Sequence, residues 1–136
     1  MDDEAVVSVK AEADIIAARQ AGRDLAALAG FSTSDQVRIA TAISEVARNI
    51  VVYVGRGEVL LKVVSEPRRI GLRVVAVDRG PGISDLDAAI EDGYSTSGGL
   101  GLGLPGARRL MDDFEITSGV DRGTQITMHL WTSRNG

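Results

Sequence analysis

Two polar residues in the segment ISEVARNIVVYV have the types and the spacing that phosphate chemistry uses. Glu45 and Asn49 are four positions apart, and residues at this spacing project side by side when the chain is helical. A carboxylate can orient or deprotonate a hydroxyl nucleophile, and an amide oxygen can complete the coordination shell of a phosphate-bound Mg²⁺. The pair therefore favours a site for a magnesium-bound phosphate, although a solvated helix face would carry the same residue types.

A second candidate stands at the end of an apolar run, in VVAVDRGPGI. The run would deliver Asp78 at the end of a strand, and Gly80 and Gly82 would let the backbone approach a ligand where a Cβ would intrude. A carboxylate facing an apolar slot can accept a hydrogen bond from an exocyclic amine such as that of adenine. The alternative is an ordinary turn that begins at an aspartate.

A third candidate is the glycine-rich stretch SGGLGLGLPGARRL, with glycines at 98, 99, 101 and 103. It would expose several backbone amides just before a helix, whose N-terminus favours anions, so it predicts phosphate binding. A flexible surface loop is the alternative. Gly101, Gly103 and Gly106 also satisfy the G-x-G-x-x-G pattern, but no strand-like run precedes them, and the chain has no Gly-Lys-Ser/Thr motif. Both the Rossmann and the Walker types of nucleotide site are therefore excluded.

These candidates need a scaffold, and the periodicity of the apolar residues predicts one. The expected elements are a strand at 6–10, a helix at 13–29, a helix from about 34, strands at 57–64 and 69–78, a short helix at 84–91, a helix from about 103, and strands at 114–119 and 123–131. This order predicts an α+β fold with two layers, in which helices cover one face of a mixed, mainly antiparallel sheet.

The helix that would carry the candidate carboxylate and amide has the clearest pattern. Thr33 followed by Gln36 matches a capping box and would start this helix near Ser34. An apolar stripe at spacings of three and four would face the core, namely Ile39, Ile43, Val46 and Ile50. His129, the single histidine, falls in the last alternating run and is expected at an exposed or edge-strand position without a catalytic role.

Composition limits the classes of partner and compartment. A chain of 136 residues with 44% hydrophobic content suits one domain spanning 1–136. The net charge of −4, with scattered Lys and Arg, argues against a nucleic-acid partner. Without cysteine there is no disulfide or thiolate metal site. No apolar run approaches the roughly 20 residues that span a bilayer, so we expect a cytoplasmic protein that is not bound to a membrane.

Taken in order, ISEVARNIVVYV, DRGPGI and GGLGLGLPG resemble the N box and the two glycine boxes of the GHKL (Bergerat-fold) ATPase and kinase superfamily. The resemblance runs nearly end to end, and it is closest to the anti-sigma-factor kinase group, in particular the RsbT-type switch serine/threonine kinases of the bacterial stressosome. It implies the histidine-kinase-like ATPase fold, with ATP and Mg²⁺ as cofactors.

The resemblance also assigns roles to residues. Glu45 would be the catalytic carboxylate and Asn49 the Mg²⁺ ligand. Asp78, assisted by Thr124, would recognise adenine. The glycine boxes would close around the base and supply lid amides to the phosphates, through Gly80, Gly82, Gly99, Leu100, Gly101, Leu102 and Gly103.

In this group the γ-phosphoryl group passes to a Ser or Thr of a STAS-domain scaffold or antagonist protein, after which the kinase activates a PP2C-type phosphatase. Anti-sigma factors usually continue the N box with a T-N-A-x-x-H-like run, whereas this chain reads RNIVVYV, which suits the switch kinases better. Two alternatives remain open: an anti-sigma factor or other non-catalytic nucleotide-binding module, and a hydrolytic ATPase.

Overall fold

The computed structural model describes residues 3–79, 104–119 and 123–133. The helix expected at 84–91 and two groups of predicted site residues lie outside these ranges. The first group is Gly80 and Gly82, and the second is Gly99, Leu100, Gly101, Leu102 and Gly103.

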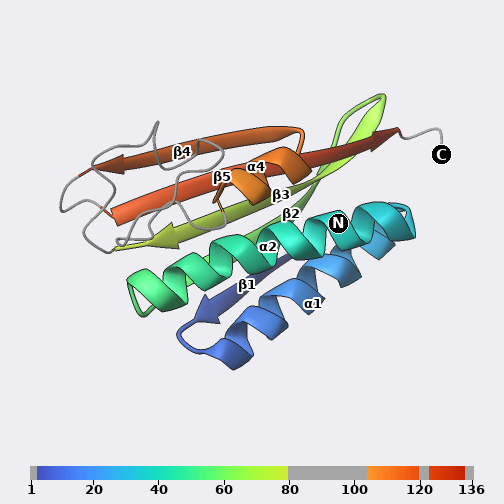
Figure 1. The fold of residues 1–136 in the computed structure, drawn as a ribbon. Coiled ribbons are helices and arrows are strands. Elements are labelled where there is room, and N and C mark those ends of the chain that lie inside the picture. The colour runs from blue at the N-terminus through green and yellow to red at the C-terminus, as the bar shows by residue number, and fades with distance from the viewer. Residues whose placement is uncertain (1–2, 80–103, 120–122, 134–136) are drawn as a thin grey trace.

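Five strands of the described chain form one antiparallel sheet in the order β1-β2-β3-β5-β4 (Figure 1). Their bounds are β1 Glu4–Val9, β2 Gly57–Ser65, β3 Arg69–Asp78, β4 Asp113–Gly119 and β5 Gly123–Ser133. Each of these was expected from alternation, and the bounds of β3 are those predicted. The sheet was expected to be mixed but mainly antiparallel, and every strand pair among the described residues is antiparallel.

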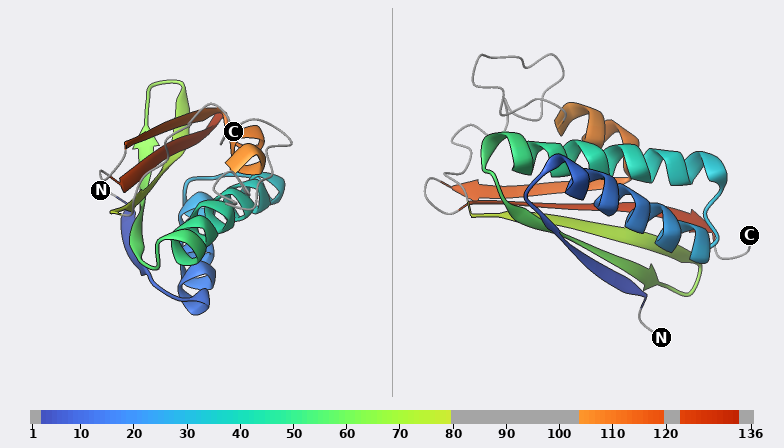
Figure 2. Two further views of the ribbon diagram at one scale, coloured as in Figure 1. Left: turned by 60° about the vertical axis from the view of Figure 1, so that its left-hand side comes forward. Right: turned by 90° about the horizontal axis from the view of Figure 1, so that it is seen from below.

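Three helices of the described chain pack on one face of this sheet, and no described helix lies on its other face (Figure 2). They are α1 Glu12–Leu28, α2 Thr33–Tyr53 and α4 Leu104–Leu110. Because helices cover this one face, every second side chain of β3 is buried. Leu72, Val74 and Ala76 lie beneath the helices, and the residues between them face the other side. The predicted two-layer α+β fold is therefore confirmed.

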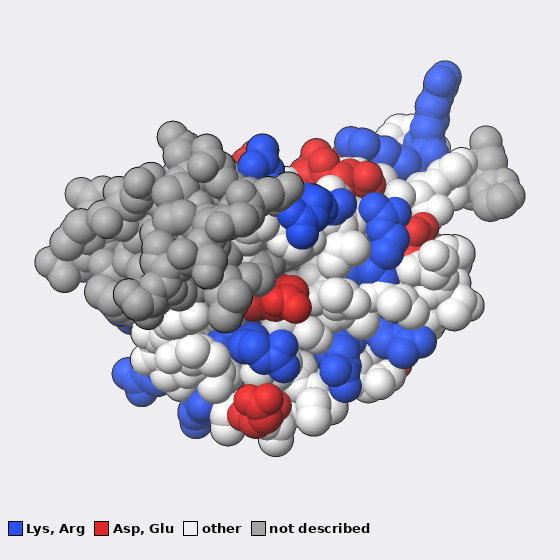
Figure 3. All heavy atoms as spheres, viewed as in Figure 1, with Lys and Arg blue, Asp and Glu red and all other residues white. Residues whose placement is uncertain are grey.

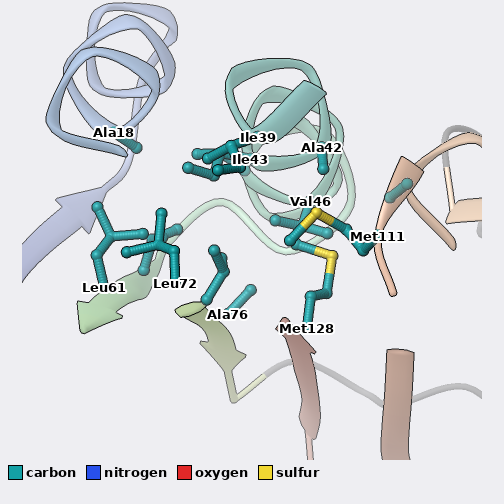
Figure 4. Close-up of a cluster of buried hydrophobic side chains, with 14 of the residues drawn as sticks. Ala18, Ile39, Ala42, Ile43, Val46, Leu61, Leu72, Ala76, Met111 and Met128 are labelled. Carbon is teal, nitrogen blue, oxygen red and sulfur yellow. The ribbon is translucent and has the colours of Figure 1, made fainter. Parts of the chain in front are cut away.

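The apolar stripe of α2 is buried as its spacing predicts, with Ile39, Ile43 and Val46 fully enclosed and Ile50 3% exposed. Figure 4 shows the stripe above side chains of β2 and β3, with Met111 and Met128 closing the core beside Val46. The helix is thus held by packing along its whole length. Its polar residues must project away from the core, toward the ends and flanks of the sheet.

The predicted start of α2 was wrong by one residue. Ser32, not Thr33, is the N-cap, and its hydroxyl accepts a hydrogen bond from the amide of Asp35 at 3.1 Å. The side chain of Gln36 donates instead to the carbonyl oxygen of Phe31, at 3.0 Å. Phe31 is buried, and its position fixes the point where the chain enters the helix. The N-cap is therefore one residue closer to the N-terminus than predicted.

The expected position of His129 was also wrong. β5 lies between β3 and β4, so His129 is in an interior strand, and its side chain is only 18% exposed. It accepts a hydrogen bond from Nε of Arg73 at 3.0 Å and stacks on Trp131, with the ring planes 6° apart. Strand order decides this position, and alternation within one strand does not reveal the order.

The face shown in Figure 3 mixes basic and acidic side chains over its described surface. A single-sign stripe that could follow a polyphosphate backbone is not seen there. The described helices include none that is long and apolar enough to cross a membrane.

Candidate nucleotide site

The residues that sequence analysis singled out on strands meet at one end of the sheet. β3 ends at Asp78, β5 begins at Gly123, and the register pairs Asp78 with Thr124. On either side of this pair, Gly57 of β2 faces Asp78 and Ser118 of β4 faces Thr124. These residues form one cross-strand row, and the parity of β3 places the row on the face that the helices cover.

Two glycines allow the backbone to close around Asp78. Gly123 has φ of 76°, a left-handed conformation that favours glycine, and a Cβ there would collide with the carbonyl oxygen of Asp78. On the other flank, a Cβ on Gly57 would lie 2.5 Å from the carbonyl oxygen of Val77 and 2.9 Å from Cγ2 of Ile50. Both glycines thus allow a close approach to the end of β3 that a larger residue would prevent.

The contact between Ile50 and Gly57 also places α2 over this end of the sheet. Asn49 precedes Ile50 and Glu45 lies four residues earlier on the same helix. Figures 1 and 2 show the C-terminal half of α2 beside the end of β3 and the beginning of β5. We call Glu45 and Asn49 on α2 the helix pair, and Asp78 on β3 with Thr124 on β5 the strand pair. The two pairs are distant in sequence but lie at the same end of the molecule.

Glu45 and Asn49 are both half-buried. The side-chain amide nitrogen of Asn49 donates to the main-chain carbonyl of Glu45 at 3.2 Å. The amide cannot be reversed in this position, because its oxygen would then face another carbonyl oxygen. The bond leaves Oδ1 of Asn49 as an acceptor directed away from the helix backbone.

That donor chemistry fits Mg²⁺. A phosphate-bound Mg²⁺ takes oxygen ligands, usually one or two from the protein and the rest from phosphates and water. Among the described residues there is no group of three or more His, Cys, Asp and Glu that could enclose a metal alone. A single amide oxygen beside a carboxylate is consistent with a metal brought in by a nucleotide.

Hollows border Asp78 on both sides. One, of about 320 Å³, is lined by Asp78 and by residues of β4 and β5 that include Thr117, Ser118, Thr124 and Gln125. The other, of about 430 Å³, is lined by Asp78 together with Gly57 and the basic side chains of Lys10, Arg56 and Arg79. Asp78 therefore borders open space on two sides at this end of the sheet.

Sequence reasoning missed Ser118. Its Oγ donates to the carbonyl oxygen of Gly123 at 3.0 Å and lies 2.9 Å from Oγ1 of Thr124. The signal was present in the segment TSGVDRGT, which joins β4 to β5, and the register of these strands pairs 118 with 124. Alternation alone does not reveal that register, which depends on the number of residues in the turn.

Comparison with known proteins gives a consistent picture. The sequence model of the histidine kinase-like ATPase domain matches residues 8–130. The serine/threonine-protein kinase RsbT of Bacillus subtilis (strain 168) is 50% identical over 131 residues, which cover 96% of this chain and 98% of that protein. An anti-sigma F factor of Clostridium beijerinckii is 26% identical over 102 residues, or 71% of each chain. Among solved structures, a mycobacterial sensor histidine kinase, MprB, aligns over 98% of this chain and 99% of its own at 15% identity, with a TM-score of 0.49.

The likeness to the Bacillus protein bears out the expectation of a serine/threonine protein kinase. The match to the ATPase domain bears out the expected superfamily and the use of ATP. Because the matched region spans residues 8–130, which include both the helix pair and the strand pair, the chain belongs to the family of histidine kinase-like ATPase domains.

Proposed function

We propose that this protein is an ATP-dependent serine/threonine kinase that phosphorylates a STAS-domain scaffold or antagonist protein. After the transfer it leaves that complex and activates a PP2C-type phosphatase. The observation that carries the proposal is the convergence of two pairs at one end of the molecule. Asp78 and Thr124 face each other across β3 and β5, and α2, with Glu45 and Asn49, packs over the same end through Ile50.

Binding of the base falls to the strand pair. The carboxylate of Asp78 accepts a hydrogen bond from the exocyclic amine of adenine, and the hydroxyl of Thr124 lies beside it. A hydrogen bond to a charged acceptor is worth about 1.5–3 kcal/mol, so Asp78 would supply a substantial part of nucleotide affinity. By the resemblance, Gly80 and Gly82 close around the base.

Phosphoryl transfer falls to the helix pair. A new bond forms between the hydroxyl oxygen of the partner's Ser or Thr and the γ-phosphorus, while the bond from that phosphorus to the β,γ-bridging oxygen breaks and ADP leaves. Glu45 orients the incoming hydroxyl and receives its proton. Oδ1 of Asn49 would hold Mg²⁺, which neutralises charge on the phosphate oxygens when bound. The lid amides at 99–103 are proposed to contact the phosphates.

The decisive experiment mixes the purified chain with candidate STAS-domain proteins and Mg·ATP, and maps phosphosites by mass spectrometry. We expect a phosphorylated Ser or Thr on a STAS protein that depends on both the chain and ATP. A chain that binds ATP but labels no STAS protein would contradict the proposed reaction.

A second function has one observation in its favour, the 26% identity to an anti-sigma F factor over 71% of the chain. A module that only sequesters a sigma factor needs nucleotide binding but no carboxylate beside the Mg²⁺ ligand. Capture of a purified sigma factor by the chain, with no phosphotransfer to any STAS protein, would favour this alternative. Sustained ATP hydrolysis without a partner would instead indicate the hydrolytic ATPase.

A further inference from the structure

Three basic residues lie side by side just beyond the ends of three neighbouring strands. The register places the last residue of β1, the first residue of β2 and the last residue of β3 in one cross-strand row. Lys10, Arg56 and Arg79 each lie one position beyond that row, at the same end of the sheet. Because neighbouring strands are about 4.8 Å apart, the three backbone positions span roughly 10 Å.

All three basic residues line the hollow of about 430 Å³ at this end of the sheet. Its lining also includes Ser8, Glu58 and Val77, each of which is next in the chain to a residue buried beneath the helices. Successive side chains of a strand point to opposite faces, so this part of the hollow belongs to the face on which no described helix lies. The helix pair, Glu45 and Asn49, is on the other face.

The hollow holds more positive than negative charge. The three cations line it together with two carboxylates, those of Glu58 and Asp78. Within residues 3–79, 104–119 and 123–133, the ion pairs involve other basic side chains and none of these three. The three basic residues are exposed, and like charges on neighbouring strands repel one another. A bound anion would offset that repulsion.

The types of the basic residues favour a phosphate group over a carboxylate. Two of the three are arginines, whose planar guanidinium groups donate in pairs to phosphate oxygens. A phosphate monoester brings about −1.5 to −2 charge at neutral pH and three acceptor oxygens. A carboxylate brings a single charge and two oxygens. The phosphate therefore offsets more of the repulsion and can accept from all three side chains.

We propose that Lys10, Arg56 and Arg79 form a binding site for a phosphate group, separate from the proposed nucleotide site. The phosphate belongs either to a small free compound or to a phosphorylated side chain of a protein, and both present the same chemistry. The carboxylate of Glu58 opposes binding, because it lines the same hollow. The inference goes beyond the proposed function and does not require it.

The test titrates the isotope-labelled chain with inorganic phosphate, without nucleotide, and follows backbone amide signals by NMR spectroscopy. We expect the signals of Gly57 and Glu58 to move and to saturate, since both residues line the hollow. Acetate at the same ionic strength should move them far less, because it carries one charge. Equal responses to acetate and phosphate, or no response to phosphate, would overturn the inference.

Variants assign the binding to the three cations. Arg56→Gln and Lys10→Gln should each raise the dissociation constant of phosphate by roughly three- to tenfold. Glu58→Gln removes an opposing charge and should lower it by roughly two- to fivefold. Arg68→Gln is the matched control, because Arg68 is an exposed arginine between β2 and β3 at the opposite end of these strands. Unchanged affinity in either cation variant that folds would contradict the site.

A serine-phosphorylated peptide and its unphosphorylated form distinguish the two sources of phosphate. Binding of the phosphorylated form at least tenfold more tightly than inorganic phosphate would support the site and identify a protein as the source. Equal affinity for the phosphorylated peptide and for inorganic phosphate would support it with a small free compound as the source. A peptide that binds equally well with and without its phosphate would count against the inference.

Failure of this inference and failure of the proposed function are distinguishable. Arg56→Gln should leave ATP affinity unchanged, because the proposed nucleotide phosphates lie with Asn49 on the other face of the sheet. If this variant weakens ATP and phosphate by the same factor, the hollow is part of the nucleotide site and the inference is wrong. If the chain phosphorylates no STAS-domain protein, the proposed reaction falls, and the phosphate titration still decides the site.

Discussion

The side-chain amide of Asn49 is tied to the main-chain carbonyl of Glu45, one helical turn earlier, at 3.2 Å. The bond orients Asn49 from within the helix, so its oxygen is positioned before any ligand arrives. In the proposed site, preorganisation of this kind would spare the reorganisation that a metal-bound phosphate otherwise requires. The carboxylate of Glu45, one turn away, is then available for a separate role.

The first prediction concerns Glu45. Glu45→Gln keeps the size of the side chain and one acceptor oxygen but cannot accept a proton, so phosphotransfer should fall by roughly 100- to 10,000-fold, the usual contribution of a general base. ATP affinity, measured by calorimetry, should remain near that of the wild type. Thr41→Ala, at an exposed position on the same helix, is the control. A parallel loss of binding and transfer would assign Glu45 to nucleotide binding.

The second prediction concerns Asp78. Asp78→Asn replaces one acceptor oxygen by a donor and removes the charge, so ATP affinity should fall by roughly 10- to 100-fold, the equivalent of one hydrogen bond to a charged group. Circular dichroism should show an unchanged fold, because the backbone pairing with Gly57 and Thr124 does not depend on the side chain. Unaltered affinity for ATP would remove Asp78 from the base site.

The third prediction tests the corrected start of α2. Ser32→Ala removes the hydroxyl that accepts from Asp35 and should lower the free energy of unfolding by about 1 kcal/mol. Thr33→Ala, one residue later and inside the helix, should cost much less, since alanine is the better helix former there. Urea denaturation of the two variants provides the comparison. The opposite ranking would restore Thr33 as the cap.

The fourth prediction uses the single tryptophan. Trp131 lies over Gly71, where a Cβ would come within 2.6 Å of its ring, and the Arg69 guanidinium stacks 3.6 Å from the ring centroid. Gly71→Ala must displace the indole, so the fluorescence spectrum should shift and the free energy of unfolding should fall by about 1–3 kcal/mol. Gly106→Ala, where a Cβ has nothing within 4 Å, should leave the spectrum unchanged. Identical spectra for wild type and Gly71→Ala would contradict the packing.

The fifth prediction is a pH dependence of stability. Burial lowers the pKa of His129 below its ordinary value of 6.5, and the nearby Arg73 guanidinium lowers it further, against the opposing pull of Asp113 and Glu115. The unfolded chain then binds a proton more readily than the folded chain does. Stability is therefore greatest above pH 6.5 on account of this residue, and is lost as the pH falls through the lowered pKa.

His129→Gln removes this titration while keeping a side chain that can accept from Arg73. Its free energy of unfolding should vary less with pH below about 6.5 than that of the wild type, as measured by urea denaturation across the range. Because carboxylates titrate in both proteins, the difference between the two curves is the quantity to compare. Parallel curves would mean that His129 does not contribute to acid sensitivity.

Local pattern was enough to predict the described elements and the face that α2 buries. The stripe from Ile39 to Ile50 is buried as expected, and β3 has the bounds that its β-rich run indicated. Burial of apolar surface is the main force that selects these elements, and the period at which apolar residues recur can be read from residues that are close in the sequence. The spacing of Glu45 and Asn49 likewise sufficed to place them one helical turn apart, where the side chain of Asn49 donates to the main-chain carbonyl of Glu45.

Tertiary structure alone decided relationships that depend on strand order and register. His129 is partly buried because β5 is an interior strand of the sheet. Residue 118 pairs with residue 124, and this register places Ser118, Thr124 and Asp78 in one cross-strand row. The contacts with Asp78 join segments separated by tens of residues, and the geometry of the end of the sheet follows from turn lengths and from the packing of α2 over it. Neither quantity can be read from the periodicity of a single segment, because each is set by how separate elements bury their surfaces against one another.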